Sequence, residues 1–70
     1  METTSEFKEH ELVVLQRDIP ESSLTRGDIG VIVGIYADQE GFEVEFVTPE
    51  GRTIDVVTLE REDIRRLEAG

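Results

Sequence analysis

Cysteine and tryptophan are absent from this 70-residue chain, and histidine and tyrosine occur once each. Without cysteine the fold has no disulfide, and one histidine is too few for a structural zinc site, which needs a cluster of Cys and His ligands. For a domain this short without disulfides or a structural metal, we expect a free energy of unfolding of only about 3–5 kcal/mol. The lack of cysteine is compatible with a reducing cytoplasm, where we expect the protein to reside.

Basic residues are scarce as well. Seven Lys and Arg stand against seventeen Asp and Glu, which gives a formal net charge of -10. The bases are scattered, so nucleic acid and anionic membranes are both disfavoured as partners. A basic protein is the partner that this charge favours, although most of the carboxylates are expected to serve solubility alone. The sequence leaves the oligomeric state open.

Long hydrophobic runs are also missing. The longest apolar run is far shorter than the roughly 20 residues that cross a bilayer. The opening METTSEFKEHE is polar and acidic, unlike a signal peptide. We therefore expect no association with membranes, a tail over residues 1–6 and a single domain over residues 7–70.

Patterns typical of catalysis and of cofactor binding do not occur. His10 is expected to lie solvated at the edge of the first strand, with nothing to place a nucleophile beside it. The glycines fit a strand and do not open a helix, so they form no phosphate-binding loop. We predict no enzymatic activity, no catalytic residues, no cofactor and no metal. A small carboxylate-dependent hydrolase stays as a remote alternative, because acids are too frequent to be informative.

The first half of the chain predicts two strands around a polar loop. Glu11–Ile19 is rich in Val and Leu and predicts a strand, and residues 20–28 predict a loop. Within the loop, the Arg-Gly-Asp triplet at 26–28 fits a type II turn, since Gly27 falls where φ is positive. We interpret the triplet as a turn and not as a recognition motif.

The next strand, predicted over residues 29–36, contains two glycines four positions apart. Gly30 and Gly34 lie on one face, which predicts a bulge or a close approach of another segment. The pattern assigns the opposite face to the core.

Two further turns predict the register of a three-stranded meander. TPEGR at 48–52 places Pro49 and Gly51 where a type I turn with a left-handed glycine needs them, and DQEG at 38–41 predicts a four-residue loop. If Thr48 pairs with Arg52, and residue 37 with residue 42, alternation brings eight apolar side chains to one core face. They are Val31, Val33, Ile35, Phe42, Val44, Phe46, Ile54 and Val56.

The end of the chain completes the predicted fold. We expect a helical turn at Glu60–Asp63 and a short closing strand at Ile64–Leu67. Five short strands with one late helical turn predict an all-β protein, a small five-stranded SH3-like barrel.

The strand entry LTRGDIGVIVGIY at 24–36 resembles the Gly-Asp-x-Gly-x-Val entry of KOW-type and related SH3-like barrels. The resemblance implies the barrel and structural roles for Gly27, Asp28 and Gly30. KOW domains often bind RNA or ribosomal partners through basic loops, which makes a ribosome- or RNA-associated accessory domain the alternative function. The acidic loops of this chain depart from that pattern. The alternative requires a basic patch built from Arg17, Arg26, Arg61, Arg65 and Arg66.

Most of the chain resembles a family of short bacterial proteins known only as a domain of unknown function. The similar segments are ELVVL near the start, FEVEFVTPEGRT in the middle and VVTLEREDIRRL near the end. The resemblance implies a bacterial single-domain protein. The resemblance also implies an antitoxin or immunity role, since toxin-like genes neighbour some members of that family, and it supplies no catalytic residues to carry over.

The predicted register leaves an acidic face opposite the core. It places Glu45 directly across from Asp55, a like-charge pair that costs a sheet a few tenths of a kcal/mol, roughly. We predict that this face binds a basic protein. Its residues are Ile32, Tyr36, Glu43, Glu45, Val47, Asp55 and Val57. The alternatives are acids neutralised by Arg17, Arg61 or Arg65, apolar residues covered by the N-terminal segment, or a plain solvated surface. A calcium site at Glu43, Glu45 and Asp55 is a further alternative, which flat strands disfavour because they splay the oxygens apart.

Overall fold

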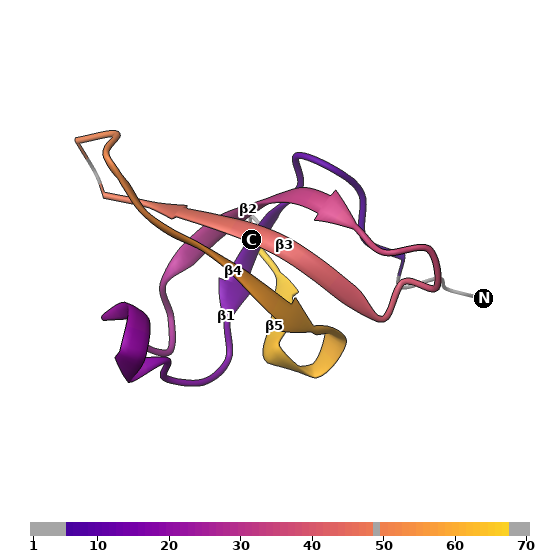
Figure 1. The fold of residues 1–70 in the computed structure, drawn as a ribbon, viewed down its shortest axis with the longest axis horizontal. Coiled ribbons are helices and arrows are strands. Elements are labelled where there is room, and N and C mark those ends of the chain that lie inside the picture. Colours follow the sequence, from indigo (N-terminus) through magenta and orange to yellow (C-terminus); the bar gives the residue numbers. More distant parts are fainter. Residues whose placement is uncertain (1–5, 49, 68–70) are drawn as a thin grey trace.

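The computed structural model describes residues 6–48 and 50–67, which form one antiparallel sheet (Figure 1). Its five strands are β1 (Leu12–Leu15), β2 (Ile29–Ile35), β3 (Gly41–Val47), β4 (Thr53–Glu60) and β5 (Ile64–Arg66). Two short 3-10 turns, η1 (Pro20–Ser22) and η2 (Arg61–Asp63), complete the described elements. The predicted all-β class, the number of strands and the helical turn before the last strand are confirmed, but the first strand ends at Leu15 and not at Ile19. The turn η1 adds local order to a segment that the sequence predicts only as a loop.

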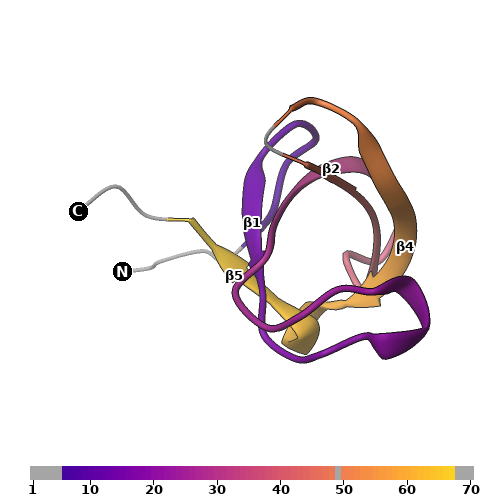
Figure 2. The ribbon, with the colours of Figure 1, turned by 90° about the vertical axis from the view of Figure 1, so that its left-hand side faces the viewer.

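The sheet curls on itself into a barrel-like shape (Figure 2). Hydrogen bonds join the strands in the order β4-β3-β2-β1-β5, so β4 and β5 stand at the two ends of that order and η2 connects them. No helix within residues 6–48 and 50–67 has the length and apolar character needed to span a membrane.

The Arg-Gly-Asp triplet is a turn, as predicted. Gly27 has φ of 99°, and the Asp28 N–H donates to the Thr25 carbonyl at 3.0 Å. The Asp28 carboxylate also accepts the Thr25 N–H at 3.0 Å. Both ends of the turn are therefore held by the chain itself, without any partner.

The turn between β3 and β4 also follows the prediction. Gly51 has φ of 90° and donates its N–H to the Thr48 carbonyl at 2.8 Å, while the Thr48 N–H donates to Arg52 at 2.7 Å. Pro49 lies outside the described residues.

A bulge in β2 reverses which side chains of the strand face the core. Near the loop Ile35 pairs with Phe42, but after an extra residue at Val33 the register shifts, and Ile32 pairs with Val44. The irregularity that the two glycines predict is therefore present. Its consequence was not anticipated: Ile32 points into the core, and the side chains of Val31 and Val33 turn outward, contrary to the prediction.

The loop before β3 also differs from the prediction by one position. The Tyr36 N–H donates to the Gly41 carbonyl at 3.0 Å, and β3 begins at Gly41. The loop is therefore 37–40 and not 38–41, because the hairpin closes one residue earlier on each side.

A second bulge lies in β4. Val47 pairs with Thr53, in agreement with the predicted turn, but an extra residue at Ile54 then shifts the register so that Val44 pairs with Val57. Ile54 and Val56 are consequently exposed, whereas the sequence assigns them to the core. Val57 packs against the core in their place.

The core fills the inside of the curled sheet. Phe42, Val44 and Phe46 are fully buried on β3, and Ile35 packs against them, as predicted. Three core side chains come from outside the strands and were missed by strand alternation: Phe7, Ile19 and Leu24. The other buried members are Val13, Leu15, Ile32, Leu59 and Ile64.

Candidate functional site

The outward side of the sheet carries an unusual number of apolar side chains. Six of them, which we call the outer patch, are each 41–49% exposed: Leu12, Ile29, Val33, Val47, Ile54 and Val56. Strand pairing places two members of the patch in one cross-strand row, because Leu12 pairs with Val31, Val31 with Glu45, and Glu45 with Val56. A single row of outward side chains therefore runs across β1, β2, β3 and β4.

Two glutamates of β3 lie on the same outward side of the sheet. Glu45 stands between Val31 and Val56, and its carboxylate accepts the Thr53 hydroxyl at 2.9 Å. Glu43, two residues earlier on the same face, is about 7 Å away along the strand. The outer patch is thus apolar with two carboxylates in its middle strand.

Hydroxyl groups hold Glu43 in its ionised form. Tyr36 donates its hydroxyl to the Glu43 carboxylate, and Thr58 donates to the same oxygen at 2.8 Å. The hydrogen bond from Tyr36, followed by that from Thr58, lowers the pKa of Glu43 below its usual range. The same bond raises the pKa of Tyr36. At neutral pH the surface therefore presents a fixed negative charge beside the half-exposed Tyr36 ring.

The structure brings only part of the predicted binding face together. Tyr36, Glu43, Glu45 and Val47 share the outward side. Ile32 is fully buried and cannot meet a partner. The bulge at Val33 is the reason, since one extra residue moves Ile32 to the opposite side of β2.

Asp55 and Val57 are also misplaced by the predicted register. The bulge at Ile54 pairs Asp55 with the buried Phe46, so Glu45 faces Val56 and the predicted like-charge pair does not form. The Asp55 carboxylate instead accepts the Ser22 hydroxyl at 2.8 Å and the Val56 N–H at 2.8 Å. Asp55 therefore ties η1 to the edge strand β4 and covers one of its backbone donors, which protects that edge from pairing with another chain.

The remaining outer-patch residues could not be found by strict alternation. Leu12 and Ile29 lie outward near strand ends, and Val33, Ile54 and Val56 lie at or beyond the bulges. The paired glycines of β2 were the one local signal of a bulge, and β4 offers no comparable signal.

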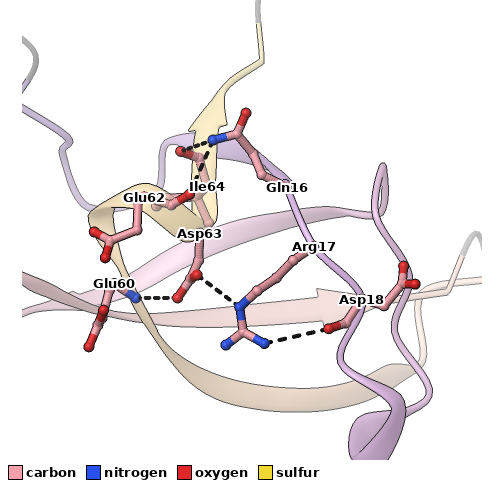
Figure 3. A network of polar contacts seen from close by, with 7 residues as sticks. All are labelled: Gln16, Arg17, Asp18, Glu60, Glu62, Asp63 and Ile64. Atoms are coloured by element: carbon pink, nitrogen blue, oxygen red, sulfur yellow. Dashed lines mark hydrogen bonds and ion pairs between the residues drawn. The ribbon is translucent and has the colours of Figure 1, made fainter.

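A second polar cluster joins η2 to the segment after β1 (Figure 3). Asp63 accepts the Arg17 Nε–H at 2.8 Å with one carboxylate oxygen and the Glu60 N–H at 2.9 Å with the other. Gln16 donates its side-chain amide to the carbonyls of Glu62 and Ile64, each at 3.3 Å. The cluster's bonds are made within the chain, so its role is to attach η2 and β5 to the barrel.

Partial burial would raise the pKa of Asp63, but the hydrogen bonds from Arg17 and from the Glu60 N–H outweigh it, and the pKa lies below the usual range. A carboxyl with a lowered folded-state pKa stabilises the fold above its unfolded pKa, and this contribution is lost as the pH falls through the folded pKa.

Replacing Asp63 with asparagine is therefore expected to lower the free energy of unfolding by about 1–2 kcal/mol at pH 7. The difference between the two proteins should shrink as the pH falls below about 4, the usual Asp pKa. Urea unfolding of both proteins at pH 7, 4 and 3 measures this. A difference that is constant with pH would show that the charge of Asp63 contributes nothing.

Neither a metal cluster nor a cavity is found in the described part of the chain. The three carboxylates considered for calcium are divided between the two faces, with Glu43 and Glu45 outward and Asp55 on the side of Phe46.

Comparison with known proteins identifies the family. Residues 9–66, well over half of the chain, match the family model described as a domain of unknown function (DUF4926). The chain belongs to this family. No curated protein and no solved structure matches it.

Proposed function

We propose that this member of the family is a protein-binding module, and that the outer patch contacts a partner that is basic at its centre and apolar around it. The observation that carries the proposal is the outward row Val31, Glu45 and Val56 across β2, β3 and β4, in which a carboxylate lies between two apolar side chains. Exposed apolar side chains that lie together often mark an interaction site.

Charge complementarity supports a basic partner. The apolar side chains can lose water on contact, while the fixed carboxylates at Glu43 and Glu45 favour cations opposite them. The net charge of -10 adds long-range attraction for a basic protein and repels nucleic acid. Arg17 and Arg66 are each paired with a carboxylate of the chain, which weakens the alternative of an RNA-binding basic patch.

An antitoxin or immunity function in the bacterial cytoplasm is one form of this proposal. It would place a basic toxin on the outer patch, and it needs no catalytic residue in this chain. The sequence resemblance and the acidic charge support it.

Substitution of Glu45 by lysine tests the proposal. Glu45→Lys places a cation at the centre of the outer patch and is expected to weaken binding of a basic partner at least tenfold, because like charges then meet in the interface. Partners are captured from the source cell, identified by mass spectrometry, purified and titrated against the wild type and the variant.

Glu21→Lys is the matched control. Glu21 is exposed on η1, outside the outer patch, and its substitution changes the net charge by the same amount. The proposal requires that Glu21→Lys keeps most of the affinity. Equal losses in the two variants would show that net charge alone attracts the partner, and no loss in either would remove the outer patch as the site.

A further inference from the structure

A separate pocket on the molecule is filled by the chain's own Phe7. This residue precedes β1 and belongs to no strand, yet it is only 6% exposed. Its ring meets Phe42 edge-on, with 5.3 Å between the ring centroids and 77° between the planes. The guanidinium carbons of Arg66 and Arg61 lie 4.8 Å and 5.4 Å from the centroid of the Phe7 ring. The walls therefore come from β3, η2 and β5.

Side chains hold the backbone around Phe7. The Gln39 carboxamide accepts the Phe7 N–H and donates to the Phe7 carbonyl, each at 3.2 Å. Arg66 donates to the Glu6 carbonyl at 2.7 Å. The Gln39 side chain thus pairs with one residue of extended backbone as a neighbouring strand would, without reading its side chain.

The segment 6–8 lies before the paired part of the sheet, whose first contact with β2 is the His10 N–H donating to the Ile32 carbonyl at 2.7 Å. The first ladder pair of β1 is at Leu12, beyond the segment. Between the two lies a tight turn, closed by the Glu11 N–H donating to Lys8 at 3.1 Å, with His10 at φ of 71°. A non-glycine residue in this left-handed region is strained, so opening the turn releases strain.

We propose that this pocket is a peptide-docking site, which residues 6–8 fill in cis and which an extended segment of another protein that carries an aromatic residue can occupy in exchange. Two guanidinium groups flank the ring and favour an aromatic occupant through cation–π contact. Arg66 is also paired with the Glu11 carboxylate and donates to the Glu6 main-chain carbonyl, so the site recognises the ring and the backbone of its occupant. The site uses none of the outer-patch residues and stands apart from the proposed function.

Because Phe7 belongs to the same chain as the pocket, any other peptide has to compete with it for binding. An intramolecular segment on a short link competes at an effective concentration in the millimolar range. A free short peptide is therefore expected to act weakly on the wild type, whereas a partner with additional contacts elsewhere can displace the segment. Removing the ring of Phe7 should unmask the site.

The test removes the Phe7 ring by substitution and then adds a free peptide that contains phenylalanine. Phe7→Ala is expected to lower Tm by about 12–40 °C, since a large buried ring is lost from a small domain. The blocked peptide acetyl-Glu-Phe-Lys-amide at millimolar concentration should raise Tm of this variant by several degrees and shift the NMR signals of the Gln39 side-chain amide. The control peptide acetyl-Glu-Ala-Lys-amide should do neither. Equal effects of the two peptides, or none, would overturn the proposal.

Two further variants keep the test decisive. If Phe7→Ala does not fold, Phe7→Leu retains an apolar filler, and preference for the Phe peptide over the Ala peptide is again the expected result. Adding Gln39→Ala to the tested variant should abolish the peptide effect, because the backbone clamp is gone. An undiminished effect in that double variant would place the peptide elsewhere and overturn the proposal.

Discussion

Replacing Ile32 with alanine is expected to lower the free energy of unfolding by about 3 kcal/mol, whereas the same change at the next residue, Val33, should cost less than about 1 kcal/mol. Ile32 is fully buried and pairs with Val44 across the inner face. Val33 sits in the bulge and is 41% exposed. A simple alternating strand would predict the reverse order, so the pair tests the bulge directly.

Urea unfolding followed by circular dichroism measures both variants. A loss of about 3 kcal/mol approaches the whole stability expected of a domain of this size, so Ile32→Val, with an expected cost of about 1 kcal/mol, provides a milder version. If Val33→Ala proved more damaging than Ile32→Ala, β2 would face the other way, and the outer patch as we define it would not exist.

Replacing Gly30 with alanine is expected to cost about 1–3 kcal/mol through overpacking. A β-carbon at Gly30 would lie 2.7 Å from a methyl carbon of Val44 and 2.8 Å from a ring carbon of Phe46. Both neighbours are fully buried, so they have little room to move. The close approach that the sequence predicts for this strand is therefore present at Gly30.

Gly34→Ala is the matched control in the same strand. Its added carbon would meet only the Glu43 side chain, at 3.5 Å, which is an ordinary contact. Since alanine also restricts the unfolded chain more than glycine does, this variant should match the wild type or exceed it by up to about 1 kcal/mol. Thermal unfolding of the two variants compares them, and equal losses would contradict the packing at Gly30.

The bulges also explain why the candidate site differs from the one expected. The sequence assigns Val33, Ile54 and Val56 to the core, and the structure places all three outward. In exchange Ile32 and Val57 move inward. The predicted face held three acids among seven residues, whereas the observed outward side keeps only two of them, Glu43 and Glu45, beside exposed apolar side chains.

The turns of this fold can be predicted from the residues that form them. Gly27 and Gly51 mark turns because only glycine takes positive φ without strain, and that requirement involves four residues at a time. The number of strands and the turn before β5 follow from such punctuation together with the apolar runs between the turns. From sequence alone these features, and with them the all-β class, are determined.

Packing decides which side of each strand faces inward. One extra residue in a strand reverses every side chain beyond it, and whether the strand accepts a bulge depends on contacts with its neighbours. The same holds for Phe7 and Leu24, whose places in the core require segments far apart in the chain to meet. Such contacts exist only after the sheet has curled, so the outer patch and the Phe7 pocket are properties of the assembled fold and not of any local stretch of sequence.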